Sequence, residues 1–189
     1  MDNILYIKDV IREYNKPGRH YHNFDHILFM YLEAEQRSIS LTDEQFLAIM
    51  FHDVIYVPGK EDNEVRSVEF MRMCIGGSLS QEYDEIITDI ILSTKHHEPL
   101  HYQAQVVIDL DLINLASSWK VYKEIVQKDR WEHHNLSDEE FKERRKKFLE
   151  KYIAKEKLFY SEFFSDNVEL KAKRNLKMEL EQIKKGRLI

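Results

Sequence analysis

Long stretches without a helix-breaking residue constrain the fold of this chain most. Only five glycines and three prolines occur among its 189 residues, and between them apolar residues recur at spacings of three and four. That spacing is the period of an α-helix, and a first stripe of Ile4, Ile7, Ile11 and Tyr14 follows it. We therefore predict an all-α fold, a helical bundle that forms a single domain over residues 1–189.

Capping residues and breaks divide the rest of the chain into further helices. They predict helices over about residues 22–37, 42–52, 63–76 and 80–98, the last of these ended by Pro99, and two long amphipathic helices after Ser137. Residues 106–112 are apolar enough for a buried strand or a buried helix, and the sequence leaves that choice open. We expect a core at about residues 19–112, with long helices at about residues 137–186 packed on it as a cover.

Apolar side chains indicate which face of each helix turns inward. The third helix carries Phe46, Ile49 and Met50, the fifth the pairs Ile86/Ile90 and Ile87/Ile91, and the last helix Ala172, Leu176, Leu180 and Ile183. The run at residues 142–151 is dense in both signs of charge and is most simply a solvated helix face.

Composition excludes several classes of function. The formal net charge of −6 disfavours binding to a nucleic-acid duplex or to an anionic membrane surface. Cys74 is the single cysteine, so no internal disulfide can form, and residues 1–14 are too charged for a secretory signal. No apolar run approaches the ~20 residues of a membrane-spanning helix. We expect a cytoplasmic protein that acts on a small molecule.

The pair His52-Asp53 lies inside an apolar run, at the end of the predicted third helix. A buried imidazole and carboxylate cost free energy unless something pairs with them, and a divalent metal is a favoured partner. His22 and His26 are four residues apart, so both rings project from one face if they share a helix. With a later carboxylate these residues form a mixed set of nitrogen and oxygen ligands. Such a set suits Mn, Fe, Co, Ni or Zn better than Ca.

The order His26, His52-Asp53, Asp111 resembles the His…His-Asp…Asp signature of the HD-domain superfamily of metal-dependent phosphohydrolases. The likeness to a bacterial branch of HD phosphohydrolases covers nearly the whole chain. Its blocks are Arg19-His20-Tyr21-His22-Asn23…His26, Phe51-His52-Asp53…Tyr56, Asn63-Glu64…Ser67, Thr94…His97, Asp109-Leu110-Asp111-Leu112, Arg130…Glu132 and Glu169…Ala172-Lys173-Arg174-Asn175-Leu176. The Tyr-His-Asn-x-x-x-His string is also similar to a motif of cyclic-nucleotide phosphodiesterases, which are distant relatives.

The resemblance implies a ligand set. It makes His26, His52 and Asp53 metal ligands, and it places the last ligand at Asp111, the aspartate before the leucine of an Ala-Asp-Leu-like triplet. A leucine stands here in place of that alanine, so Asp109 stays the alternative. The metal would be Mn, Fe, Co, Ni or Zn, with Mg open for a second site.

The resemblance also implies a reaction, the hydrolysis of a phosphate ester of a nucleotide or another small molecule. The metal would lower the pKa of a bound water and polarise a phosphoryl oxygen. His22, or alternatively His97, would protonate the leaving oxygen. Arg19 and Lys95 would hold the phosphate, and Glu64 would activate or position water.

Other functions stay open at this stage. An HD-type di-iron oxygenase would use His96 and His97 as extra ligands, and a non-catalytic module would sense a nucleotide or bind a protein. Some nucleotidases of the superfamily carry a glutamate three residues after the His-Asp pair, where this chain has Tyr56, so their way of positioning water is not transferred. A homodimer is also open.

Several residues also have a plain structural interpretation. Arg19 could be an ordinary surface residue, and Glu64 a carboxylate that the helix dipole favours in a first turn. We expect the remaining histidines to be exposed and inert, namely His20, His101, His133 and His134.

Overall fold

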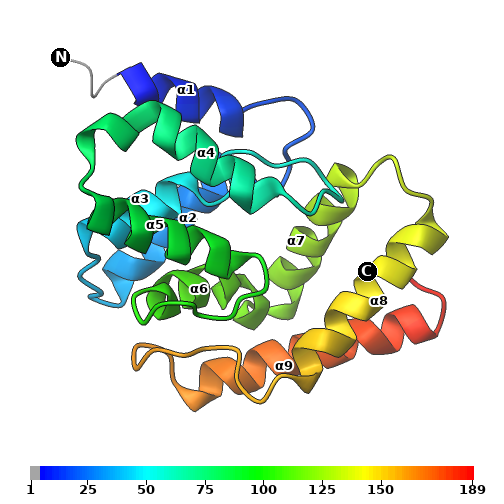
Figure 1. Ribbon diagram of the computed structural model, residues 1–189. Helices are drawn as coiled ribbons and strands as arrows, with labels where there is room; N and C mark the ends of the chain where they lie inside the picture. The colour runs from blue at the N-terminus through cyan, green and yellow to red at the C-terminus, as the bar shows by residue number, and fades with distance from the viewer. Residues whose placement is uncertain (1–4) are drawn as a thin grey trace. The chain divides into compact units, whose positions relative to one another are not determined.

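The structure is a computed structural model and describes residues 5–189, so Ile4 of the predicted first stripe lies outside the described residues. In these residues the chain forms nine α-helices and no β-strand, which confirms the predicted all-α fold (Figure 1). The helices are α1 (Leu5–Tyr14), α2 (Phe24–Gln36), α3 (Asp43–Phe51), α4 (Asn63–Ile75), α5 (Gln81–Thr94), α6 (Ala104–Leu112), α7 (Trp119–Glu132), α8 (Asp138–Ala154) and α9 (Asp166–Lys184). Across the described part of the chain, none of them combines the length and hydrophobicity needed to cross a bilayer.

The chain divides into two compact units, and the division falls between Asp111 and Leu112. The first unit ends in the last turn of α6, and the second unit begins at Leu112, just before the short 3-10 helix η3 (Ile113–Ala116). Every residue that we predict at the metal site falls in the first unit. The prediction of a single domain stays a prediction.

Helix α5 is the central helix of the first unit, because α3 and α4 both pack against it. Ile87, Ile90 and Ile91 are fully buried, which confirms the inward face that the isoleucine pairs predict, while Ile86 is half-buried. Ser80 caps this helix by accepting a hydrogen bond from the backbone N–H of Tyr83.

The start of α2 differs from the prediction. The side chain of Asn23 accepts hydrogen bonds from the backbone N–H groups of Asp25 and His26, so the helix begins at Phe24. His22 therefore lies before the helix, and the expectation that it shares a helical face with His26 is wrong. An N-cap asparagine stops the helix from extending back to His22, because the cap residue itself has an extended backbone.

The other boundaries follow their signals more closely. The capping box of Thr42 and Gln45 starts α3, as predicted, and α4 ends where Gly76 caps it. The apolar segment whose conformation the sequence leaves open belongs to the helix α6.

Two predicted inward faces are rotated. Ile7 and Ile11 of α1 are each 39% exposed, whereas Val10 and Tyr14 are fully buried. On α3, Phe46 is 45% exposed, although Ile49 beside the same face is buried as predicted and Met50 is half-buried. Apolar character alone does not decide which of several adjacent hydrophobic side chains a short helix buries.

In the second unit, α8 and α9 lie side by side (Figure 1), and η3 packs on α9. The predicted capping box of Ser137 and Glu140 starts α8. Helix α7 is absent from the predicted helices, because its buried stripe of Tyr122 and Val126 is narrow among charged residues. The expectation that His133 is exposed is wrong, since this residue is 3% exposed and packs on the ring of Phe141.

Candidate metal centre

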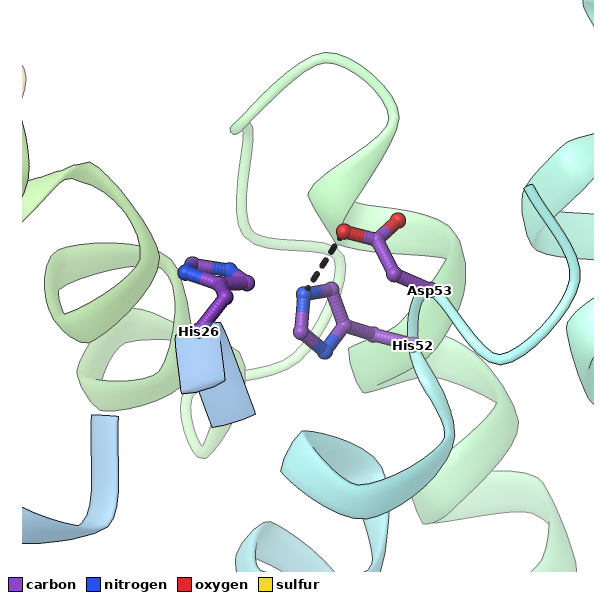
Figure 2. A group of neighbouring side chains, drawn as sticks. All are labelled: His26, His52 and Asp53. Carbon is purple, nitrogen blue, oxygen red and sulfur yellow. Dashed lines mark ion pairs between the residues drawn. The ribbon is translucent and has the colours of Figure 1, made fainter. Parts of the chain in front are cut away.

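Three residues at helix ends form a buried polar group in the first unit (Figure 2). His26 lies in the first turn of α2, His52 caps the carboxyl end of α3, and Asp53 follows it. Within the described residues, one potential ligand atom from each lies within 4.8 Å of the other two. The structure therefore contains a buried cluster that could hold a metal ion.

A hydrogen bond to the backbone fixes the orientation of the His52 ring. Its Nδ1 lies 3.0 Å from the backbone carbonyl oxygen of Ile49. A carbonyl oxygen only accepts, so Nδ1 carries a proton and donates it, which directs Nε2 toward the carboxylates. In metal-binding histidines, the ring nitrogen that does not bind the metal commonly donates its proton to a carbonyl or carboxylate oxygen.

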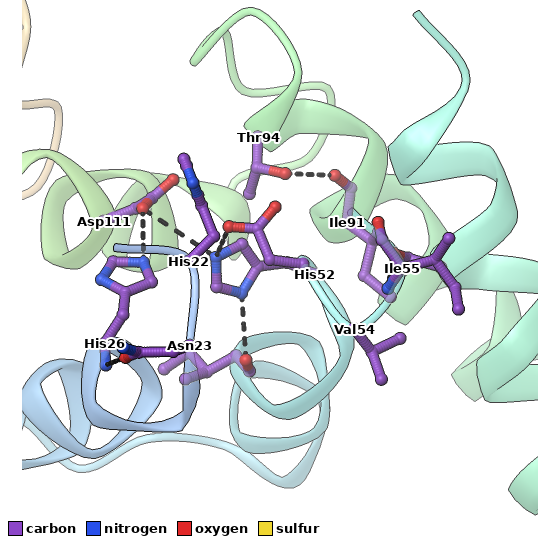
Figure 3. A network of polar contacts seen from close by, with 12 residues as sticks. His22, Asn23, His26, His52, Val54, Ile55, Ile91, Thr94 and Asp111 are labelled. Atoms are coloured by element: carbon purple, nitrogen blue, oxygen red, sulfur yellow. Dashed lines mark hydrogen bonds and ion pairs between the residues drawn. The ribbon is translucent and has the colours of Figure 1, made fainter. Parts of the chain in front are cut away.

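Asp111 reaches the same cluster from the last turn of α6 (Figure 3). Its Oδ1 lies 3.0 Å from His26 Nε2 and 3.9 Å from His52 Nε2. Asp109 is fully buried two residues earlier on the same helix, and side chains with that spacing point in nearly opposite directions. Asp111 is thus the aspartate of α6 that faces His26 and His52.

The distances in this group fit a metal site. Ligand atoms that lie 2.0–2.2 Å from one metal ion are about 3 Å apart, and His52 Nε2 lies 3.1 Å from Asp53 Oδ2. Among residues 5–189, the buried His52 Nε2 forms a close ion pair with Asp53 but makes no hydrogen bond of good geometry. Two groups that approach closely without an aligned hydrogen bond are suited to share a third atom, as ligands of one metal ion do.

Charge within the cluster shifts the pKa values of its members. Burial lowers the pKa of His52, but the negative charges of Asp53 and Asp111 outweigh burial and raise this pKa to about 9. Burial opposes ionisation of Asp53, yet the charge of His52 holds its pKa below the usual value. Burial also opposes ionisation of Asp111, whose pKa is lowered by hydrogen bonds from His26 and His97. Both carboxylates are therefore negative at neutral pH, which favours a cation.

His97 is held next to Asp111 by an unusual backbone. It follows α5 with a φ of +50°, in the left-handed region that side chains other than glycine seldom adopt. Its Nε2 lies 2.9 Å from Asp111 Oδ2, the carboxylate oxygen other than the one near His26. The structure thus brings a third imidazole to the site, whereas the neighbouring His96 is exposed.

His22 approaches the site from the loop before α2. Its ring stacks on Tyr56, with centroids 3.9 Å apart and an angle of 23° between the planes. Burial raises the pKa of Asp53, and His22 adds to the effect of His52 in lowering it. Tyr56 occupies the position of the glutamate that some nucleotidases carry, and here its ring supports an imidazole.

The two predicted phosphate-binding cations make different contacts. The Arg19 guanidinium donates to the backbone carbonyls of His22, Asp53 and Val54. Lys95 Nζ donates to the carbonyl of Glu61 and lies 3.6 Å from its carboxylate. The side chain of Lys95 is 30% exposed, and the phosphate-binding role of both residues stays a prediction.

Glu64 lies in the first turn of α4, at the edge of the group. Burial raises its pKa, and the charge of Asp53 raises it further, while Lys95 and His97 lower it. These influences place Glu64 within electrostatic reach of the predicted site, where a carboxyl group with a raised pKa can hold or release a proton.

The sequence does not reveal two supporting contacts. The carbonyl of Ile49 orients His52, and the buried ring of Tyr14 lies 5.0 Å from the Arg19 guanidinium. A backbone carbonyl has no sequence signal at all. The position of Tyr14 shows only as one apolar residue in a helical stripe.

The chain was compared with models of protein families, with curated proteins and with solved structures, and it matches none of them. The resemblance to the HD-domain superfamily therefore rests on the motifs and stays a prediction.

Proposed function

We propose that this chain is a metal-dependent phosphohydrolase that cleaves a phosphate ester of a nucleotide or another small molecule. One observation carries the proposal, the convergence of two buried imidazoles and two carboxylates, from His26, His52, Asp53 and Asp111, at the ends of three helices. Nitrogen and oxygen ligands without a thiolate suit Mn, Fe, Co, Ni or Zn. Bound there, such a metal supplies a Lewis acid that activates water and polarises a phosphoryl oxygen.

His22 is the candidate for protonating the leaving oxygen. Its ring is held flat against Tyr56, close enough to Asp53 to interact with its charge. An imidazole fixed in this way can deliver a proton to a leaving group bound beside the ligands. His97 is the alternative donor, although its contact with Asp111 also suits a role in holding that carboxylate.

The rim of the site supports binding of an anionic ester. Lys95 brings a positive charge, and an ammonium group binds phosphate as a point charge. Glu64 lies within electrostatic reach of Lys95 and His97, and its raised pKa, caused first by burial, suits a group that positions water or exchanges a proton. Both residues would act on the substrate, so their substitution should leave metal affinity largely intact.

Substitution of Asp53 tests the proposal directly. Asp53→Asn removes a charge from the cluster while keeping its shape, so both metal retention and phosphate release should fall to background. Metal content is measured after gel filtration. Phosphate release is measured for protein loaded with Mn, Co, Ni or Fe on mono-, di-, tri- and cyclic nucleotides. Asp25→Asn is the matched control, because Asp25 is an exposed carboxylate one residue before His26.

Two results would count against a hydrolase. Wild-type activity that survives complete chelation would exclude a metal mechanism, as would an Asp53→Asn variant that keeps its rate. If the loaded protein binds a nucleotide tightly but releases no phosphate from any of the esters, a sensing module is preferred.

An HD-type oxygenase is the second candidate, and the position of His97 favours it. A third imidazole 2.9 Å from Asp111 Oδ2 offers a ligand for a second metal ion on the far oxygen of that carboxylate. Two iron ions per chain, together with oxygen consumption in the presence of a small organic substrate, would support the oxygenase. One metal per chain and no oxygen uptake would leave the hydrolase as the better proposal.

A further inference from the structure

Arg19 lies in the loop between α1 and α2, yet its guanidinium joins two segments of the site. Nη1 donates to the carbonyl oxygen of His22 at 2.8 Å, and Nη2 donates to those of Asp53 and Val54 at 2.7 and 3.0 Å. Building on the proposed function, we propose that Arg19 is a positioning residue. It holds the candidate proton donor His22 and the candidate metal ligand Asp53 in register, and it does not bind the phosphate.

The hydrogen bonds that Arg19 already makes compete with bidentate binding of a phosphate. A guanidinium binds an anion in a bidentate manner through two parallel N–H groups on adjacent nitrogens. Both such forks, Nη1 with Nη2 and Nε with Nη2, need an N–H of Nη2. Because Nη2 already donates to two carbonyls, a phosphate would have to compete with them for this nitrogen. Releasing this nitrogen for phosphate would remove the contacts with Asp53 and Val54.

Those carbonyls follow directly after the carboxyl end of α3, where a cation is favoured. His52 caps this helix, and the carbonyls of the residues after it have no partner further along the same helix. A positive charge at a helix carboxyl end both satisfies these groups and complements the helix dipole. Since the carbonyl and the side chain of Asp53 share one Cα, anchoring the carbonyl restricts where the carboxylate points.

Two aromatic rings hold the guanidinium in place. It lies 5.0 Å from the ring centroid of the fully buried Tyr14 and 5.8 Å from that of Tyr56. The ring of Tyr56 also stacks on His22 at 3.9 Å. Arg19 therefore reaches His22 by two routes, through its carbonyl and through Tyr56. It reaches Asp53 through the other terminal nitrogen of the same guanidinium, so one side chain contacts both segments.

The test compares four proteins as full chains: wild type, Arg19→Met, Arg19→Lys and Arg12→Met. Arg12 is the matched control because its side chain is 69% exposed on α1. Three quantities are measured: Co²⁺ affinity by calorimetry, the visible absorption of the Co²⁺-loaded protein, and the affinity of that loaded protein for inorganic phosphate. A fourth, hydrolysis of p-nitrophenyl phosphate, is resolved into kcat and KM.

A positioning role predicts a specific pattern. Loss of a group that orients metal ligands typically weakens metal binding or activity about 10- to 100-fold, so Arg19→Met should lower Co²⁺ affinity and kcat by that factor and change the absorption spectrum. Phosphate affinity and KM should change less than about twofold. Arg19→Lys restores part of the helix-end charge and should recover part of the Co²⁺ affinity, which also guards against a variant that fails to fold. Arg12→Met should match wild type.

The opposite pattern would overturn the assignment. If Arg19→Met keeps the Co²⁺ affinity and spectrum of wild type but raises KM and weakens phosphate binding, Arg19 binds the substrate instead. A wild-type protein that binds Co²⁺ and hydrolyses no ester defeats the proposed function, while the affinity and spectrum still decide the role of Arg19. A wild-type protein that binds no Co²⁺ defeats both.

Discussion

At the scale of single residues, the proposed function makes a proton and a metal ion compete for His52. Its Nδ1 is committed to the carbonyl of Ile49, so any charge exchange at this ring happens at Nε2, the atom that faces Asp53 and Asp111. The two carboxylates raise its pKa to about 9 against the effect of burial. Without metal, a proton on Nε2 therefore partly neutralises the carboxylates at neutral pH. A metal ion has to displace that proton.

This competition predicts that metal binding depends on pH. With the pKa of His52 near 9 in the metal-free protein, Co²⁺ binding at pH 7 should release about one proton from this ring. Affinity should then rise about tenfold per pH unit up to about pH 9 and fall as the solution becomes more acid. Calorimetric titrations in two buffers of different ionisation enthalpy measure the released proton. Affinity that stays constant from pH 6 to pH 8 would contradict the exchange.

The sequence predicts the acidic and imidazole side chains of this site better than their surroundings. The order of His26, His52-Asp53 and Asp111 needs only the printed residues, and the structure brings those side chains together. The bond from His52 to Ile49 and the positive φ of His97 involve the backbone, which is nearly the same for every residue type. Such details depend on the path of the chain, so no residue pattern predicts them.

At the scale of helices, α9 shows why an inward face can contain charge. Ala172, Leu176 and Ile183 are buried as predicted, but Leu180 is only half-buried and Glu179 is 1% exposed. Arg145 of α8 makes two contacts with the Glu179 carboxylate, at 2.7 and 3.1 Å, and Tyr122 of α7 donates to it. The interpretation of residues 142–151 as a solvated face is therefore wrong for Arg145, whose side chain is 12% exposed. The sequence does not predict a buried ion pair between two helices, because the pair depends on how those helices pack together.

Removing one member of this pair should destabilise the protein strongly. Glu179→Ala leaves the largely buried guanidinium of Arg145 charged, since arginine is not deprotonated in proteins, with Asp129 at 3.3 Å as a remaining acidic contact. Breaking a buried ion pair in this way costs about 3–5 kcal/mol. Urea unfolding measures the change, and Glu181→Ala on the exposed side of α9 is the control, with an expected effect below about 0.5 kcal/mol. Equal effects of the two variants would show that the pair contributes little.

Glu169 and Asn175, from the motif near the carboxyl end, stabilise local structure in the second unit. Asn175 donates to the carbonyls of Leu115 and Ser117, and the Glu169 carboxylate accepts from the backbone N–H groups of Leu158 and Phe159. These contacts join α9 to η3 and to the loop after α8. Resemblance to family motifs identifies such residues without indicating whether they serve structure or chemistry.

At the scale of the whole molecule, the candidate metal centre lies entirely within the first of two compact units. It joins segments that are far apart in sequence, because His26 and Asp111 are separated by 85 residues. A ligand that binds only the folded state adds stability to the segments it connects. The second unit contributes none of the four candidate ligands.

Metal addition should therefore protect the two units unequally. At a free metal concentration of 100 times Kd, binding adds about 2.7 kcal/mol of stability. Hydrogen exchange of the full chain should show slower exchange in α2, α3 and α6 after loading, and smaller changes in α7, α8 and α9. Chelation should reverse the difference. Protection confined to α7, α8 and α9 would place the metal elsewhere.

If His97 serves the proposed function, its left-handed backbone links that function to a loss of stability. A side chain other than glycine in this conformation costs about 1–2 kcal/mol, and the residue that would relax it, glycine, carries no imidazole. The chain spends stability at this position to keep a ring beside Asp111. Selection for heat resistance alone would favour glycine at this position and would remove the imidazole. Thermostability and the proposed chemistry therefore favour different residues here.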